Sequence, residues 1–168
     1  MPRSFDMAAE YEGSVEQVHR AFSDEQYWLA RLEDSGADDY TLDAMEVGPD
    51  GHIDVATTQI LRADRLPGWV HQFYRGEVRL LRTEKWSPVE DGKAHAEVTG
   101  SVPGAPASLS GKAVLRPTET GSRLEFNVTV EVGIPLVGGK IENFIGGLLA
   151  DLLIAEQRFT TVWLTENA

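Results

Sequence analysis

With 168 residues, a formal net charge of −12 and no cysteine, the chain has the size of a single domain and excludes disulfides, thiolate metal sites and cysteine nucleophiles. Residues 1–54 hold 14 of the 27 acidic side chains against only three arginines, which disfavours nucleic-acid binding because phosphate neutralisation requires lysine and arginine. A solvated acidic surface accounts for this charge without any partner. We therefore expect one domain over residues 1–168 and no nucleic-acid partner.

The apolar segments are too short or too interrupted for a signal peptide or a membrane helix. No run of seven or more apolar residues opens the chain, and polar residues break the most apolar stretch, residues 134–154. This pattern predicts no integral membrane association and a cytoplasmic location.

The first quarter of the chain predicts one strand followed by two short helices. Residues 4–12 alternate loosely in polarity, as a strand does, and Ser14 then stands three residues before Gln17, which is the spacing of a capping box at a helix start. Ser23 and Gln26 repeat this spacing and predict a second short helix.

From residue 40 onward the hydrophobic period changes to two, which is typical of strands. Asp50-Gly51 and Asp91-Gly92 mark tight turns within this region. Consecutive strands joined by short turns favour an antiparallel meander. The predicted strands cover residues 40–46, 53–61, 77–86, 93–100, 109–116 and 123–132.

Residues 138–167 predict one long helix. Its apolar residues recur in alternating steps of four and three, which places them on one narrow stripe that needs an apolar surface. We therefore predict an α+β fold, in which a curved antiparallel sheet of about seven strands wraps around a long C-terminal helix, with two short helices after the first strand. The stripe consists of Ile141, Ile145, Leu148, Leu152, Ala155, Phe159 and Trp163.

Gly146 and Gly147 interrupt this helix at a cost of about 1 kcal/mol each relative to alanine. Both lie off the stripe, which favours a bend in the helix or close packing of its backbone. A bend would let the first half of the helix lift to admit a ligand.

Small side chains dominate the sheet positions expected to face the helix. Opposite large helix residues they would leave a space, and an unfilled void costs stability unless something else occupies it. The alternative is a size match of small strand residues against large helix residues. The positions are Ala94, Ala96, Val98, Gly111, Ala113 and Leu115.

Three segments carry a resemblance to the START-like superfamily, the helix-grip fold shared by START lipid-transfer domains, birch-pollen-type allergens, and polyketide cyclases and dehydratases. They are the opening helix segment 14–24, the strand-turn segment 115–124 and the helix approach through Ile134-Pro135. Segment 135–142 is similar to that of an uncharacterised branch of this superfamily. The resemblance covers nearly the whole chain and implies a helix-grip fold with an internal cavity, while carriers, receptors and enzymes share that scaffold.

Strand 77–86 carries charge on the same face as apolar residues. If Val78 and Leu80 point inward, Arg82 and Glu84 do so too, and a buried charge must be paired or hydrogen-bonded. The alternative is an exposed strand end or a bulge that swaps the faces. Facing inward, Arg82 and Glu84 would form a polar end to the cavity together with three residues of inward parity, namely Glu46, Thr57 and Gln59.

Residues 69–74 form an aromatic-rich segment between two strands. The resemblance places this segment, which includes Trp69 and Phe73, near the mouth of the cavity. His71 could act there as an acid or base, and Tyr74 could donate a hydrogen bond to an oxyanion. More often such aromatic residues cap a core.

The four histidines are too scattered to gather metal ligands on one element. The sequence has no Gly-x-Ser-x-Gly elbow, no Gly-x-Gly-x-x-Gly loop and no Walker motif. We therefore expect no metal site and no cofactor.

The favoured hypothesis is binding, transport or sequestration of a hydrophobic small molecule, such as a lipid, sterol or polyketide, between helix and sheet. The expected apolar contacts are Trp69, Phe73, Leu115, Phe126, Val128, Val130, Ile141, Ile145, Leu148 and Leu152. The expected polar contacts are Glu46, Thr57, Gln59 and Arg82.

Two alternatives come from other classes of protein. One is a metal-independent cyclase or dehydratase of the polyketide type, in which a bound carbonyl is polarised by His71, Tyr74, Arg82 or Glu84. The other is a protein-interaction module that uses the acidic N-terminal third and binds no small ligand.

Overall fold

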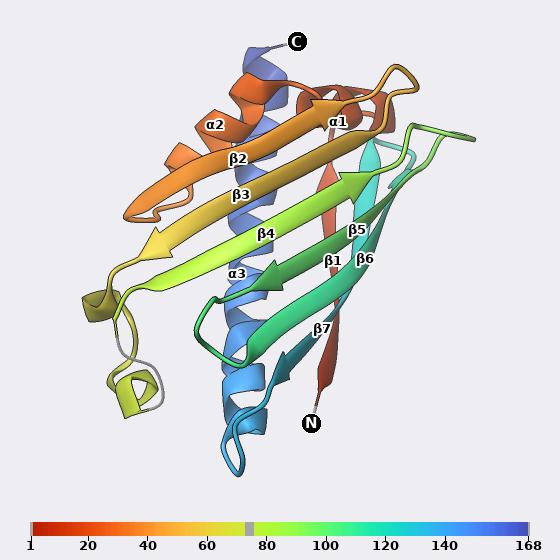
Figure 1. Cartoon of the computed structure of the whole chain (residues 1–168). Coiled ribbons are helices and arrows are strands. Elements are labelled where there is room, and N and C mark those ends of the chain that lie inside the picture. The colour runs from red at the N-terminus through yellow and green to blue at the C-terminus, as the bar shows by residue number, and fades with distance from the viewer. Residues whose placement is uncertain (1, 73–75, 168) are drawn as a thin grey trace.

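The computed structural model describes residues 2–72 and 76–167 and shows a curved antiparallel sheet with a long helix lying across one face (Figure 1). The seven strands have the spatial order β1-β7-β6-β5-β4-β3-β2. The strands are β1 (Arg3–Tyr11), β2 (Asp39–Val47), β3 (Ile53–Leu61), β4 (Val78–Trp86), β5 (Ala94–Ser101), β6 (Ala107–Pro117) and β7 (Ser122–Val132).

In residues 2–72 and 76–167, three α-helices accompany the sheet, in the order that the sequence predicts. Two short helices follow β1, and the long one ends the chain. The predicted α+β class and the antiparallel meander are therefore confirmed. Within the described residues, no helix is both long and apolar enough to cross a membrane. The helices are α1 (Val15–Phe22), α2 (Glu25–Asp34) and α3 (Gly138–Glu166), and two short 3-10 helices, η1 (Ala63–Arg65) and η2 (Gly68–Gln72), connect β3 to β4.

Side-chain caps start the two short helices. The capping box at Ser14 is present, because its hydroxyl accepts from the Gln17 backbone N–H at 3.2 Å and the Gln17 side chain accepts from the Ser14 N–H at 2.8 Å. The second cap is one residue later than predicted. Asp24, not Ser23, accepts from the Gln26 N–H, while the Ser23 hydroxyl donates to the Arg20 carbonyl at the end of α1.

The packed core lies at one end of the sheet, where α1, α2 and the C-terminal half of α3 come together (Figure 1). The ring centroids of Phe22 and Trp86 lie 5.0 Å apart, and those of Tyr27 and Trp163 lie 5.7 Å apart. The small strand residues predicted to leave a space lie mostly in this core, where large aromatic side chains pack against them. For Ala94 and Ala96 the size match is therefore the correct alternative, whereas Val98 and Ala113 line a small cavity.

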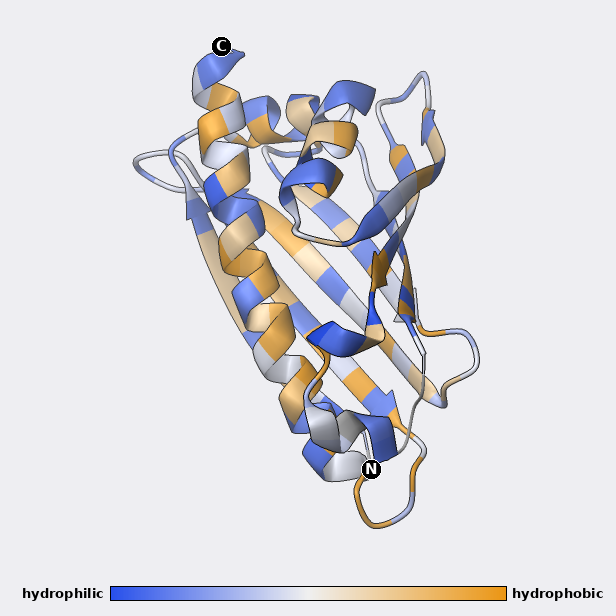
Figure 2. Ribbon diagram, turned by 90° about the vertical axis from the view of Figure 1, so that its left-hand side faces the viewer, coloured by the Kyte–Doolittle hydropathy of each residue, from blue (hydrophilic) through white to orange (hydrophobic). Residues whose placement is uncertain are grey.

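Helix α3 carries apolar residues along its whole length (Figure 2), but its most buried side differs from the predicted stripe. It packs mainly against β1 and β7, and its buried positions are Gly138, Glu142, Gly146 and Thr160. Leu148, which belongs to the predicted stripe, is 48% exposed. The stripe therefore joins the core only in its C-terminal part, at Phe159 and Trp163.

The two helix glycines play different roles. A Cβ atom at Gly146 would lie 2.4 Å from the ring of Phe5 on β1, whereas a Cβ at Gly147 would meet no atom within 4 Å. Of the two sequence-based explanations, close backbone packing therefore holds at Gly146.

We predict opposite stability effects for Gly146→Ala and Gly147→Ala. The methyl group at residue 146 forces the Phe5 ring out of its place, which lowers the free energy of unfolding by about 1 kcal/mol net of the gain in helix propensity. The methyl group at residue 147 meets open space and raises that free energy by about 1 kcal/mol. Urea denaturation of both variants measures the difference.

The matched control is the double variant Phe5→Ala with Gly146→Ala. Because the clash partner is gone, adding Gly146→Ala to the Phe5→Ala background stabilises the protein. Equal stabilisation by both single alanine substitutions would show that α3 does not rest on Phe5.

Candidate functional site

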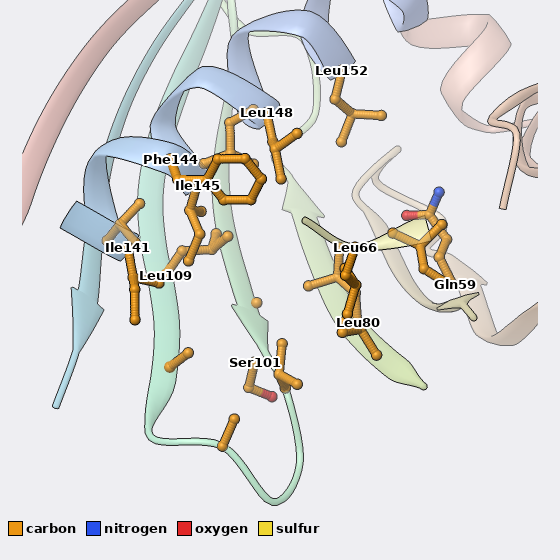
Figure 3. Close-up of a pocket in the computed structure, with 18 of the residues that line it drawn as sticks. Gln59, Leu66, Leu80, Ser101, Leu109, Ile141, Phe144, Ile145, Leu148 and Leu152 are labelled. Atoms are coloured by element: carbon orange, nitrogen blue, oxygen red, sulfur yellow. The ribbon is translucent and has the colours of Figure 1, made fainter. Parts of the chain in front are cut away.

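A cavity of about 500 Å³ lies between the N-terminal half of α3 and the sheet. Its walls are mostly apolar, and the helix side is contributed by the first part of the predicted stripe. Figure 3 shows Ile141, Phe144, Ile145, Leu148 and Leu152 projecting from α3, with Leu109 beside them and Leu66, Leu80, Gln59 and Ser101 on the strand and loop side.

The cavity exists because none of the helices in the described part of the chain fills the space under this half of α3. Helices α1 and α2 both cover the other end of the sheet (Figure 1), and part of the cavity wall consists of residues too small to fill the space. These small residues surround the β5–β6 connection and include Gly100, Ser101, Ala105, Ala107 and Ser108.

One side of the cavity wall is exposed at its rim. Leu148 is half exposed, and Asp151 next to it on α3 is exposed as well. Across from them the rim is formed by Gly36 and Arg65, whose guanidinium donates to the Gly36 carbonyl. The cavity is therefore accessible between α3 and the connections α2–β2 and β3–β4.

Four ionised side chains from three elements meet beyond the deep end of this cavity. Arg31 of α2 lies 2.6 Å from Glu156 of α3, and Arg82 of β4 contacts Glu156 at 3.1 Å and Glu84 at 3.0 Å. Arg31 also approaches Glu84 at 3.5 Å. Two cations and two anions thus cancel, which is the arrangement that makes buried charge tolerable.

Hydroxyl groups extend this charged cluster into the core. The Tyr27 hydroxyl accepts from Arg31 at 3.4 Å and lies 2.6 Å from the Thr160 hydroxyl, which in turn donates to the Glu156 carbonyl at 2.7 Å. The Trp86 indole N–H donates to Glu84 at 3.2 Å. The network ties α2, β4 and α3 together at the boundary between core and cavity.

The cluster changes the protonation equilibrium of Glu156. Burial alone would raise the pKa of its carboxyl group, but the charges of Arg31 and Arg82 outweigh burial and lower that pKa below its ordinary value. Glu156 is therefore ionised at neutral pH.

A second, smaller cavity of about 70 Å³ adjoins the large one and reaches this cluster. The two cavities share the wall residues Leu109, Leu149 and Leu152. The small cavity is also lined by Tyr11 and Phe126 and by the four charged residues of the cluster. The large apolar cavity thus leads to a smaller one whose wall is also mostly apolar but includes the charged cluster.

The apolar residues predicted for the site divide into three groups. The large cavity is lined by Val130, Ile141, Ile145, Leu148 and Leu152, and the small one by Phe126 and Leu152. Leu115 and Val128 are completely buried and line neither cavity. Trp69 packs edge-to-face on Phe144 beside the cavity, with Lys140 over its ring, and Phe73 lies outside the described residues.

The polar predictions have mixed outcomes. Arg82 and Glu84 do face inward, so the alternative of an exposed or bulged strand end is wrong. Gln59 lines the large cavity, and Thr57 is buried opposite Arg82 in the register of β3 and β4. His71 lies in η2, outside the walls of both cavities, and Tyr74 lies outside the described residues.

Glu46 was predicted to face the cavity, and this prediction is wrong. Its side chain is 73% exposed and lies near His52 on the outside. A register irregularity between Leu42 and Ala44 adds a residue to β2, and the extra residue reverses the faces beyond it. Met45 consequently takes the inward place.

The sequence predicted two of the four charged residues of the cluster, Arg82 and Glu84, but not Arg31 and Glu156. Arg31 stands four residues after Tyr27, and Glu156 stands four residues after Leu152 and four before Thr160. Each is therefore a charged residue on the inward face of its helix. That spacing is the signal that would have indicated buried partners, since such charges are tolerated only in pairs.

We predict that Glu156→Gln lowers stability most at neutral pH. Because the folded-state pKa of Glu156 lies below its unfolded value, its ionised form stabilises the fold above the unfolded pKa, and this contribution is lost as the pH falls through the folded pKa. The variant should lose about 3 kcal/mol of unfolding free energy at pH 7 and show a shallower decline toward pH 3 than the parent protein. Urea denaturation across this pH range measures both effects.

The control is Glu166→Gln, at the exposed end of the same helix. It should leave stability and its pH dependence unchanged. A parallel decline in the parent protein and Glu156→Gln would contradict the role assigned to the ion pairs.

Comparison with known proteins gives a family and a fold. The model of the family described as "Protein of unknown function (DUF2505)" matches residues 6–164. The uncharacterized protein Rv0481c of Mycobacterium tuberculosis is 50% identical over 173 residues, which cover 99% of each chain.

Three solved structures have similar folds at low sequence identity. TTHA0849 from Thermus thermophilus has a TM-score of 0.62 at 17% identity and covers 100% of this chain and 99% of its own. Ara h 8.0201 has a TM-score of 0.60 at 12% identity, with 95% of this chain and 98% of its own covered. The di-domain ARO/CYC StfQ from the steffimycin biosynthetic pathway has a TM-score of 0.60 at 15% identity, with 99% of this chain and 52% of its own covered.

These neighbours confirm the resemblance to the START-like, helix-grip superfamily at the level of the fold. The match along residues 6–164 and the mycobacterial relative assign the sequence family. The chain belongs to the DUF2505 family and has a START-like helix-grip fold.

Proposed function

We propose that the protein binds a hydrophobic small molecule in the cavity beneath the N-terminal half of α3. The observation that carries this proposal is an apolar space of about 500 Å³ inside a fold that is tightly packed at its other end. Ligand pockets in proteins commonly measure about 300 to 1,000 Å³ and have mostly apolar walls with a few polar groups.

The energetics favour occupation of this cavity. An unfilled apolar space deprives its wall residues of dispersion contacts and costs stability. A ligand that buries roughly 300 Å² of apolar surface gains about 7.5 kcal/mol before the costs of association are subtracted. A lipid, a sterol or a polyketide-like compound has surface of this kind, and carriage or sequestration of such a compound is the biochemical role that we infer.

A polyketide cyclase or dehydratase activity is the weaker alternative. Of its four candidate residues, Arg82 and Glu84 are paired with each other and with Glu156 and Arg31. His71 contributes to the wall of neither cavity, and Tyr74 is not among the described residues. The hypothesis of a protein-interaction module does not explain why the large cavity is present. Ligand binding therefore accounts for more of the geometry than either alternative.

We predict that Leu148→Trp blocks binding of a neutral apolar probe. Leu148 points into the cavity at its rim (Figure 3), so a tryptophan there occupies the space the probe needs. The affinity for N-phenyl-1-naphthylamine, measured by its fluorescence increase, should fall about tenfold or more, which corresponds to about 1.4 kcal/mol.

The matched control is Ile154→Trp. Ile154 is 49% exposed on the same helix and lines neither cavity, so this variant should bind the probe as the parent protein does. The proposed function would be contradicted if the parent protein showed no saturable binding of the probe. It would also be contradicted if both tryptophan variants bound the probe with equal affinity.

A further inference from the structure

The wall of the small cavity includes a tyrosine whose hydroxyl group has no hydrogen-bond partner among the described residues. Tyr11 of β1 is 5% exposed and lines this cavity. Within residues 2–72 and 76–167, no hydrogen bond joins the Tyr11 hydroxyl to another group. The hydroxyl oxygen is not one of the fully buried polar atoms that lack a partner, so it is open to the adjoining space, where a polar group can form a hydrogen bond with it.

Tyr11 differs in this respect from its neighbour Tyr27. The Tyr27 hydroxyl is engaged by both Arg31 and Thr160. Burial raises the pKa of the Tyr11 hydroxyl, and the charges of Glu156 and Glu84 act in the same direction. The Tyr11 hydroxyl therefore stays protonated at neutral pH and can donate a hydrogen bond.

The four charged side chains in the wall of the small cavity favour an uncharged ligand group. Arg31, Arg82, Glu84 and Glu156 carry two positive and two negative charges in mutual contact. A carboxylate placed among them would add a third negative charge, and an ammonium group would add a third positive one, each at a desolvation cost that no free counter-charge offsets. A neutral polar group avoids that cost.

Among neutral groups, a hydroxyl matches the available partners best. A carboxylate oxygen can accept two hydrogen bonds, so Glu84 and Glu156 keep acceptor capacity beyond their arginine contacts. A ligand hydroxyl can accept from Tyr11 and donate to one of these carboxylates at the same time. A ketone or ester carbonyl can use only the donor.

We propose that the small cavity binds the hydroxyl end of an otherwise apolar alcohol, with Tyr11 as the hydrogen-bond donor. The proposal rests on the proposed function, because the apolar part of the same molecule occupies the large cavity across the shared residues Leu109, Leu149 and Leu152. The ligand class is accordingly a neutral long-chain or polycyclic alcohol rather than a fatty acid.

The test is displacement of N-phenyl-1-naphthylamine by three probes of equal chain length: dodecan-1-ol, 1-chlorododecane and dodecanoate. At pH 8, where dodecanoate is ionised, dodecan-1-ol should displace the dye at a concentration about tenfold lower than dodecanoate does. Tyr11→Phe should weaken dodecan-1-ol about fivefold and leave 1-chlorododecane and the dye unchanged, because the variant loses only the hydrogen-bond donor.

Tyr40→Phe provides the matched control, because Tyr40 lies on β2 and lines neither cavity. It should bind all three probes as the parent protein does. Tyr11→Phe removes a hydroxyl group that forms no hydrogen bond within the described residues, so its urea midpoint should not fall below that of the parent protein. A change in affinity cannot then be assigned to unfolding.

The outcomes separate the two proposals. If the dye binds but Tyr11→Phe does not weaken dodecan-1-ol, the hydroxyl site is wrong and the proposed function stands. The same conclusion follows if dodecanoate displaces the dye more strongly than dodecan-1-ol does. Failure of the parent protein to bind the dye or any of the three probes overturns both.

Discussion

The backbone of α3 approaches β1 closely because residue 146 has no side chain, and the Phe5 ring occupies the place where a Cβ would be. Since β1 is an edge strand and pairs with β7, a helix resting on these two strands lies toward one side of the sheet. The inner surfaces of β3 to β6 then need another layer. Helices α1 and α2 provide it at one end only, and the cavity is the part of the sheet that remains uncovered.

The charged cluster lies at the boundary between the filled and the hollow end. Arg31, Arg82, Glu84 and Glu156 connect α2, β4 and α3, and their hydrogen bonds continue through Tyr27 and Thr160 into the core. Ion pairs at this depth contribute little net stability compared with apolar packing, but loss of one partner is costly. The network therefore fixes the relative positions of three elements while it presents polar groups to the adjoining small cavity.

The order and type of the elements could be predicted because they depend on local patterns. The capping box at Ser14 and the Asp50-Gly51 and Asp91-Gly92 turns act over two to four residues, and all are present. The orientation of Glu46 could not be predicted, since the irregularity after Leu42 has no clear mark in the sequence and reverses every later residue of β2.

The location of the cavity also depends on contacts that no local pattern reveals. The helix stripe was correctly identified as apolar, but periodicity does not say which part meets packed side chains and which part meets empty space. That difference arises from the position of α1 and α2 in space. Ala94 and Ala96 show the same limit, because their small size suits the large aromatic rings of the core rather than a ligand.

Native mass spectrometry of the protein purified under mild conditions from its own host tests the central claim most directly. An unfilled space beneath the first half of α3 predicts a non-covalent adduct with the mass of a lipid-sized molecule, which gentle collisional activation removes to leave the bare chain. Two results together would contradict the claim that this space is a ligand site: only the bare chain is detected, and the same preparation fails to take up an added apolar alcohol.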